Sequence, residues 1–215
     1  MDTVSYNKIR GELDTGDILL WSSTSFFSRL IQTFCNSSWS HVGMVVRFPG
    51  DLLMLWESTL DDRVSGVRLT PLSQSLCDTV AVRKMHIERT PLLFESVMKV
   101  RKELNGRPFE SDLMQMVCAS YDGPLGHNDT DLTSLFCSEL IAETLIRIGI
   151  LGSSKPSNEY TPKDFSSEAS TPLNLLGNVN LDDEIIIDYA AINTQSAKSH
   201  NKSKLINKII PALRS

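Results

Sequence analysis

Alternation of apolar and polar residues is clearest between positions 41 and 57. The predicted strand from His41 to Phe48 carries two different faces: Val42, Met44, Val46 and Phe48 on one, His41, Gly43, Val45 and Arg47 on the other. Pro49-Gly50-Asp51 predicts a turn, and residues 52–57 then return as a second strand. If the turn pairs Phe48 with Leu52, Glu57 lies opposite Gly43 and becomes a diagonal neighbour of His41, roughly 7–8 Å away at the backbone. The absent side chain at Gly43 would leave room for the two to meet, whereas a slip of one residue would separate them.

Short apolar runs predict further strands at residues 18–21, 67–69, 80–83 and 185–187. Two helices are expected between these runs. One begins after Ser25 and has a common face made of Phe27, Leu30, Ile31 and Phe34. The other opens with Thr90-Pro91, a cap followed by proline at the first helical position, and ends at Asn105-Gly106.

An amphipathic helix is also predicted after Ser134, which is a suitable N-cap. Its two sides differ in character: Leu140, Ile141, Thr144, Leu145 and Ile148 on one, Glu139, Glu143 and Arg147 on the other. Cys137 is then the third helical residue and points inward with the apolar side. The dipole and unpaired amides of a helix N-terminus stabilise a thiolate, the reactive form of cysteine. Cys137, His41 and Glu57 therefore supply the order thiol, imidazole and carboxylate that nucleophilic catalysis requires.

Each of these three residues also has a purely structural interpretation. A free cysteine is usually buried and behaves as a small apolar residue. A histidine at the start of a strand is more often a hydrogen-bonded structural group than a base. Glu57 on a solvated strand would be half-exposed. The residue pattern alone leaves both interpretations open.

Several motifs together resemble the circularly permuted NlpC-type papain-like superfamily of cysteine hydrolases and acyltransferases, and most closely its poxvirus branch. They are Gly16-Asp17-Ile18-Leu19-Leu20, Ser40-His41-Val42-Gly43, Glu57, Asn105-Gly106-Arg107-Pro108-Phe109, Phe136-Cys137-Ser138-Glu139-Leu140 and Tyr160-Thr161-Pro162-Lys163-Asp164-Phe165. Their order is the most specific part, because the histidine strand precedes the cysteine helix in the permuted branch. The resemblance spans about residues 11 to 190.

This resemblance implies an α+β, permuted papain-like fold in which a small antiparallel sheet packs on the helix that carries the cysteine. Cys137 would be the nucleophile, His41 the general base and Glu57 the group that orients the imidazole, with the Cys137 amide helping to stabilise the oxyanion. One departure is Phe109, where relatives often carry a tyrosine. Tyr121 could supply the missing hydroxyl.

Length and charge favour one catalytic domain, residues 1–194, followed by a basic tail, residues 195–215. The chain has 215 residues, 41% of them hydrophobic, and a net charge of -5. Five basic residues follow Asp188, so the body sums to -10 and the tail to +5. An acidic body disfavours nucleic acid as a partner. The partly amphipathic tail could bind an anionic membrane or a host protein, or remain a solvated terminus.

No apolar signal region or membrane-spanning stretch is present in the sequence, which favours the cytoplasm, and the host cytoplasm if the protein is viral. Cys35, Cys77, Cys118 and Cys137 are then expected to stay reduced. A metal enzyme is the weakest alternative, because His86, His127 and His200 lack short ligand spacings. Neither a metal nor another cofactor is expected.

The function expected from these residues is acyl transfer through a cysteine thioester. The substrate would be an amide or ester in an acylated lipid, peptide or protein, and the acceptor either water or another group. The alternative is a catalytically silent form of the same fold that acts as a virus–host protein-binding or virulence module.

Overall fold

The structure, a computed structural model, describes residues 1–59, 65–108 and 136–190. Its strands are β1 (Asp2–Ser5), β2 (Ile18–Ser22), β3 (His41–Phe48), β4 (Leu52–Thr59), β5 (Gly66–Pro71), β6 (Thr79–Arg83), β7 (Met85–His86), β8 (Asn180–Leu181) and β9 (Ile185–Asp188). Its helices are α1 (Tyr6–Ile9), α2 (Phe26–Cys35), α3 (Leu72–Ser75), α4 (Pro91–Leu104) and α6 (Cys137–Arg147), with short 3-10 turns η1 (Ser157–Glu159) and η2 (Pro162–Phe165). The tail predicted at residues 195–215 lies outside these ranges.

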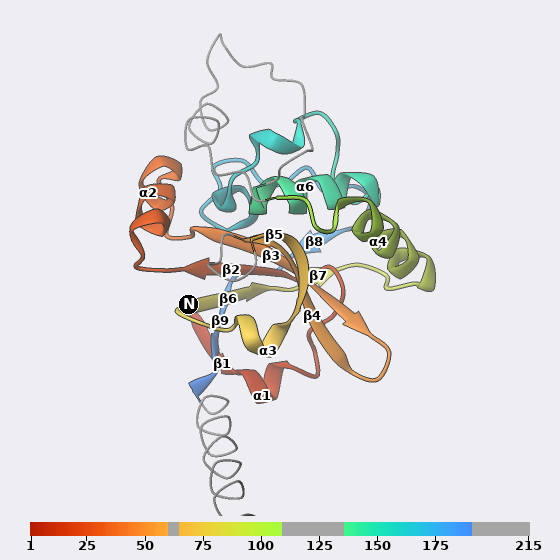
Figure 1. The fold of residues 1–215 in the computed structure, drawn as a ribbon, viewed down its shortest axis with the longest axis horizontal. Helices are drawn as coiled ribbons and strands as arrows, with labels where there is room; N and C mark the ends of the chain where they lie inside the picture. Colours follow the sequence, from red (N-terminus) through yellow and green to blue (C-terminus); the bar gives the residue numbers. More distant parts are fainter. Residues whose placement is uncertain (60–64, 109–135, 191–215) are drawn as a thin grey trace, which may run out of the picture.

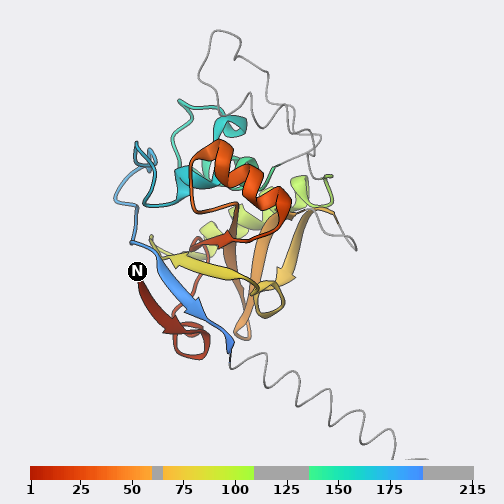
Figure 2. The same cartoon turned by 90° about the vertical axis from the view of Figure 1, so that its left-hand side faces the viewer.

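Within the described ranges, seven strands form one mixed sheet in the order β1-β9-β6-β2-β3-β4-β5. The chain is therefore α+β, as expected. The expectation of a small, purely antiparallel sheet is wrong at one edge, because β1 runs parallel to β9. Figure 2 shows these two strands side by side, which brings the start of the chain against its last described strand.

The predicted register of the β3–β4 hairpin is confirmed. Phe48 pairs with Leu52 and Met44 with Trp56, the register that the prediction required. The turn between the strands uses left-handed backbone at Gly50 and Asp51, with φ of 79° and 63°. The space beside Gly43 is filled differently from the prediction. A Cβ there would lie 2.7 Å from a methyl carbon of Leu55, so Leu55 and not Glu57 occupies the room.

Each face of the sheet is covered by its own apolar core. Helices α4 and α6 lie above the sheet and α1 and α3 beneath it in Figure 1. The upper core joins strand residues to the helices above them, and its members include Val42, Met44, Trp56, Leu104, Cys137, Leu140 and Ile141. The lower core lies against the short helices beneath, and its members include Ile9, Leu13, Leu19, Val45, Leu55 and Leu72. Helix α6 packs directly on β3 and β4. Because both faces are covered, β3 is buried without interruption from Val42 to Val46, whereas the predicted alternation is typical of a strand with one solvated face.

Two helix starts follow the prediction closely. The Ser25 hydroxyl accepts a hydrogen bond from the Ser28 amide at 3.2 Å, and the Thr90 hydroxyl accepts one from the Leu93 amide at 3.2 Å. The face predicted for α2 is wrong in part, because Phe34 is 47% exposed while Cys35 is buried. In the part of the chain that the structure describes, no helix combines the length and apolar character needed to cross a bilayer.

Candidate active site

His41 and Glu57 meet at the end of the central hairpin. The His41 Nε2 atom lies 3.1 Å from the Glu57 Oε2 atom, within hydrogen-bonding distance. Glu57 is 5% exposed, so water competes little for its carboxylate. This contact follows from the register, which places both residues on one face near the first residue of β3.

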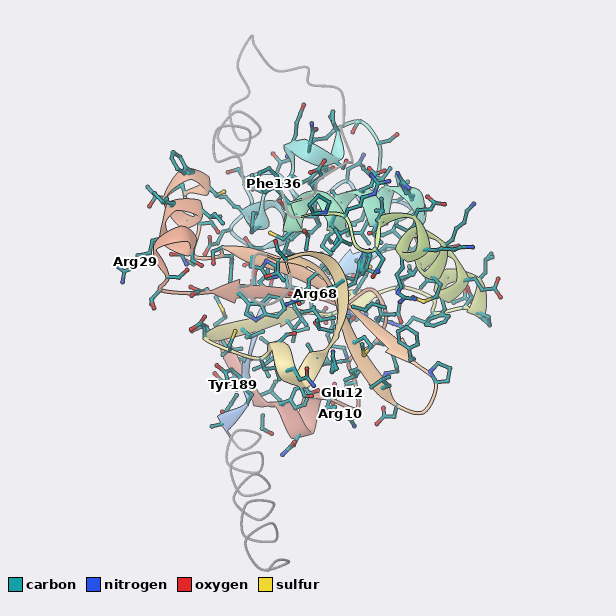
Figure 3. The ribbon with its side chains drawn as sticks, in the orientation of Figure 1. Arg10, Glu12, Arg29, Arg68, Phe136 and Tyr189 are labelled. Carbon is teal, nitrogen blue, oxygen red and sulfur yellow. The ribbon has the colours of Figure 1, made fainter. Side chains whose placement is uncertain are left out.

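The second carboxylate oxygen of Glu57 is held by the neighbouring strand β5. The Thr70 hydroxyl donates a hydrogen bond to Glu57 Oε1 at 3.0 Å, and Arg68 Nε lies 3.6 Å from the same oxygen. Arg68 stands opposite Glu57 in the β4–β5 register, on the edge strand of the sheet, and is labelled in Figure 3. Burial acts to raise the pKa of Glu57. The partners His41, Thr70 and Arg68 outweigh that effect and lower its pKa below the usual value.

Cys137 is the first residue of α6, and the prediction of Ser134 as N-cap is wrong. The N-cap is Phe136, which Figure 3 labels at the start of the helix. The Phe136 amide donates a hydrogen bond to the Glu139 carboxylate at 3.4 Å. Glu139 is therefore buried at 4% exposure, in contrast to the predicted solvent-facing side. The inward direction predicted for Cys137 is confirmed, since the residue is 6% exposed.

The Cys137 thiol lies close enough to the His41 imidazole for each group to shift the pKa of the other. The nearby backbone amides of Val42 and Ser138 also lower the pKa of Cys137. Since Nε2 of His41 faces Glu57, Nδ1 is the ring nitrogen left for the thiol. Cysteine, histidine and glutamate thus lie in sequence, with the imidazole between the thiol and the carboxylate.

Cys137 and His41 shift each other's pKa in opposite directions. Burial acts to raise the pKa of Cys137, but the charge of His41 and the hydrogen bonds to the sulfur lower it below the usual value. Burial acts to lower the pKa of His41, but Cys137 and Glu57 raise it above the usual value. The environment therefore favours a thiolate–imidazolium pair.

Trp21 completes the immediate surroundings of the histidine. Its ring centroid lies 5.2 Å from that of His41, at an interplanar angle of 60°. Trp21 pairs with His41 across β2 and β3, so the contact is fixed by the sheet. The His41 side chain keeps 21% exposure, which leaves an approach from solvent to the imidazole.

The other candidate residues do not join this cluster. His86 forms an exposed pair with Asp182, at 2.7 Å. Of the other described cysteines, Cys35 is buried and Cys77 is exposed. Other predicted residues lie outside the described ranges: Phe109, Cys118, Tyr121, His127 and His200. Among the described residues no group of three metal-ligating side chains is found.

A cavity of about 400 Å³ lies between Arg83 and the segment from Asp164 to Leu181. Neither Cys137 nor His41 lines it. The candidate chemistry is therefore separate from this cavity.

Comparisons with known proteins add little to this geometry. No protein-family model matches the chain, and a search of curated proteins found no match. Among solved structures, the metalloprotein yiiX from Escherichia coli O157:H7 is similar at 21% identity and a TM-score of 0.47. The similar region covers 62% of this chain and 64% of the yiiX chain. The chemistry of the site is therefore argued from this chain alone.

Proposed function

We propose that the chain is a thiol-dependent acyl hydrolase or acyltransferase of the permuted papain-like, NlpC-type class. One observation carries the proposal: a buried thiol at a helix N-terminus lies beside an imidazole that is itself hydrogen-bonded to a buried carboxylate. A cysteine that served only as an apolar core residue would need neither partner. The histidine strand precedes the cysteine helix along the chain, which fits the permuted order.

In the proposed reaction, His41 takes the proton of Cys137 and the thiolate attacks an amide or ester carbonyl carbon. The tetrahedral intermediate carries a negative oxygen, for which the Cys137 backbone amide is the proposed donor. His41 then gives its proton to the leaving amine or alcohol as the carbon–heteroatom bond breaks, leaving a thioester. Water or another acceptor, deprotonated by His41, attacks the thioester and restores the thiol. Glu57 stays ionised and holds the imidazole throughout.

Labelling with acyl electrophiles tests the nucleophile and the substrate class together. A panel of lipid-like and peptide-like acyl electrophiles should modify Cys137 at neutral pH, and mass spectrometry locates the adduct. Because its pKa is lowered, Cys137 should react at least about tenfold faster than Cys77, whose pKa is raised by burial and nearby Asp78. The preferred electrophile identifies lipid or peptide acyl groups as the substrate class.

The matched variants are Cys137→Ala and Cys77→Ala. Cys137→Ala should abolish labelling and acyl release while changing thermal stability little, because only one sulfur atom is removed. Cys77→Ala should retain both activities. Equal, slow labelling of all cysteines in the native protein would contradict the proposal and favour the catalytically silent binding module.

A further inference from the structure

Two hydroxyl groups extend the hydrogen-bond chain beyond Glu57. Thr70 on β5 donates to Glu57 Oε1 at 3.0 Å, and the Thr70 hydroxyl oxygen lies 3.0 Å from that of Ser75 at the end of α3. Hydrogen bonds thus link Ser75, Thr70, Glu57 and His41, from a short helix on the lower side of the sheet to the imidazole beside Cys137 of α6 on the upper side.

The direction of this chain is fixed by chemistry. An ionised carboxylate has no proton, so Thr70 must be the donor in its contact with Glu57. The Thr70 hydroxyl has one proton, which that bond uses. The Ser75 hydroxyl is therefore the donor in the contact with Thr70. Every hydroxyl proton points toward Glu57, and hydrogen bonds aligned in one direction polarise one another.

Helix α3 also holds the aromatic wall of the histidine. The Trp21 Nε1–H group donates to the Ser75 carbonyl oxygen at 3.0 Å, while the Trp21 ring packs beside His41. The helix is anchored by Leu72, which is fully buried in the lower core. Ser75 therefore supports the position of the imidazole in two ways. Its side chain contacts Thr70, which binds Glu57, and its backbone carbonyl binds Trp21.

We propose that Thr70 and Ser75 are positioning residues of the candidate active site, whose aligned hydroxyls hold Glu57 ionised and oriented so that His41 faces Cys137. This inference rests on the proposed function, because it assigns the two residues a task in preparing that nucleophile. It makes β5 and α3 parts of the site, although neither carries a group that touches the thiol.

The test compares Thr70→Val, Thr70→Ser, Ser75→Ala and the double variant Thr70→Val/Ser75→Ala. The readout is the rate of Cys137 alkylation by iodoacetamide as a function of pH. Without its donor, Glu57 binds a proton more readily, so the acid limb should move to higher pH in Thr70→Val. A charge-assisted hydrogen bond predicts an alkylation rate about tenfold lower than native on that limb. Thr70→Ser, which keeps the hydroxyl, should restore the native profile.

Ser75→Ala should shift the limb in the same direction by a smaller amount. Since Ser75 acts through Thr70, the double variant should match Thr70→Val alone. Additive effects of the two substitutions, or a native pH profile in Thr70→Val, would overturn the inference.

Failure of the proposed function has a different signature. If native Cys137 reacts no faster than Cys77, the function fails, and NMR titration of the His41 ring then decides the role of the hydroxyls. The inflection that reports Glu57 should move to higher pH in Thr70→Val and return in Thr70→Ser. An unmoved inflection would overturn the inference independently of any activity.

Discussion

At the scale of single residues, Cys137 and His41 stabilise each other's charged form. The pKa of Cys137 is lowered, so its thiolate is lost only when the pH falls through that lowered value. The pKa of His41 is raised, so its imidazolium is lost only when the pH rises through that raised value. The ion pair is therefore populated between the two values, a window that opens below the ordinary pKa of a cysteine and closes at about pH 10.

This window predicts the pH dependence of alkylation. In the native protein, the iodoacetamide rate at Cys137 should reach its plateau at a lower pH than an ordinary cysteine does, because the thiolate forms at lower pH. In His41→Ala the thiol loses its counter-charge, so the rate should instead climb with pH up to at least about pH 8.5, the range of an ordinary cysteine. His86→Ala is the control, because His86 pairs with exposed Asp182 and should leave the profile unchanged. A native profile in His41→Ala would contradict the ion pair.

Sequence reasoning reached the pair His41 and Glu57 but stopped short of Thr70. The short turn and the two-residue alternation were enough to fix which residues share a face. Thr70 was available by the same logic: it lies two residues beyond Arg68, the partner of Glu57, and is therefore its diagonal neighbour on β5. The predicted strand, residues 67–69, ends one residue before Thr70. A polar residue just after a short apolar run is typical of a solvent-exposed strand end.

At the scale of elements, β5 is held in place by the segment that follows α4. The Val67 amide donates to the Arg107 carbonyl at 2.8 Å, and the Gly106 amide donates to the Val67 carbonyl at 2.8 Å. Gly66 permits this approach, because its φ is +113° and a Cβ there would lie 2.3 Å from the Arg107 oxygen. The position of Thr70 and Arg68 beside Glu57 thus depends on Gly66, at the start of the same strand.

Gly66→Ala should therefore destabilise the fold and disturb the site. Both the strained backbone and the clash with a carbonyl contribute, for a loss of about 2–4 kcal/mol in the free energy of unfolding. Urea denaturation measures the loss, and alkylation of Cys137 reports the site. The matched control is Gly11→Ala, where an added Cβ meets nothing within 4 Å. Equal stability of the two variants would contradict the close approach at Gly66.

Helix α6 shows where element prediction fails. Its apolar side was read correctly, and Leu140, Ile141, Thr144 and Leu145 are buried. The first turn differs from the prediction, because the N-cap is Phe136, a residue without a capping oxygen. The Glu139 carboxylate accepts a hydrogen bond from the Phe136 amide. Burial of Glu139 follows from this local bond. Side-chain periodicity carries no information about such a bond.

At the scale of the whole molecule, the outer edge of the sheet was not predictable from local pattern. Strand β1 contains Val4 as its one clearly apolar residue, and it pairs with β9 from the far end of the described chain. A parallel edge pair of this kind is specified by backbone hydrogen bonds and by packing against the lower core. Neither leaves a periodic signal in a strand of four residues.

The candidate site requires both cores to be intact at once. Cys137 belongs to the upper core, whereas the residues around Glu57 and Trp21 are supported by the lower core through Leu55 and Leu72. One sheet separates the two cores and is shared by both. Loss of either core should therefore remove the alignment of the thiol with the imidazole.

Leu13→Ala in the lower core and Leu104→Ala in the upper core test this coupling. Both side chains are fully buried, so each variant should lose about 2–5 kcal/mol of stability. Since the sheet is common to both, tryptophan fluorescence and rapid Cys137 labelling should be lost in a single coincident thermal transition, shifted downward in each variant. In Leu13→Ala, the folded-state tryptophan fluorescence could be lost at a temperature where rapid labelling of Cys137 persists. That result would show instead that α6, β3 and β4 keep the thiol and imidazole aligned without the lower core. Coincident transitions in both variants would mean that Cys137 and His41 come together only in the complete fold. Local sequence pattern can place each residue on its element, but contact between them depends on the packing of both cores.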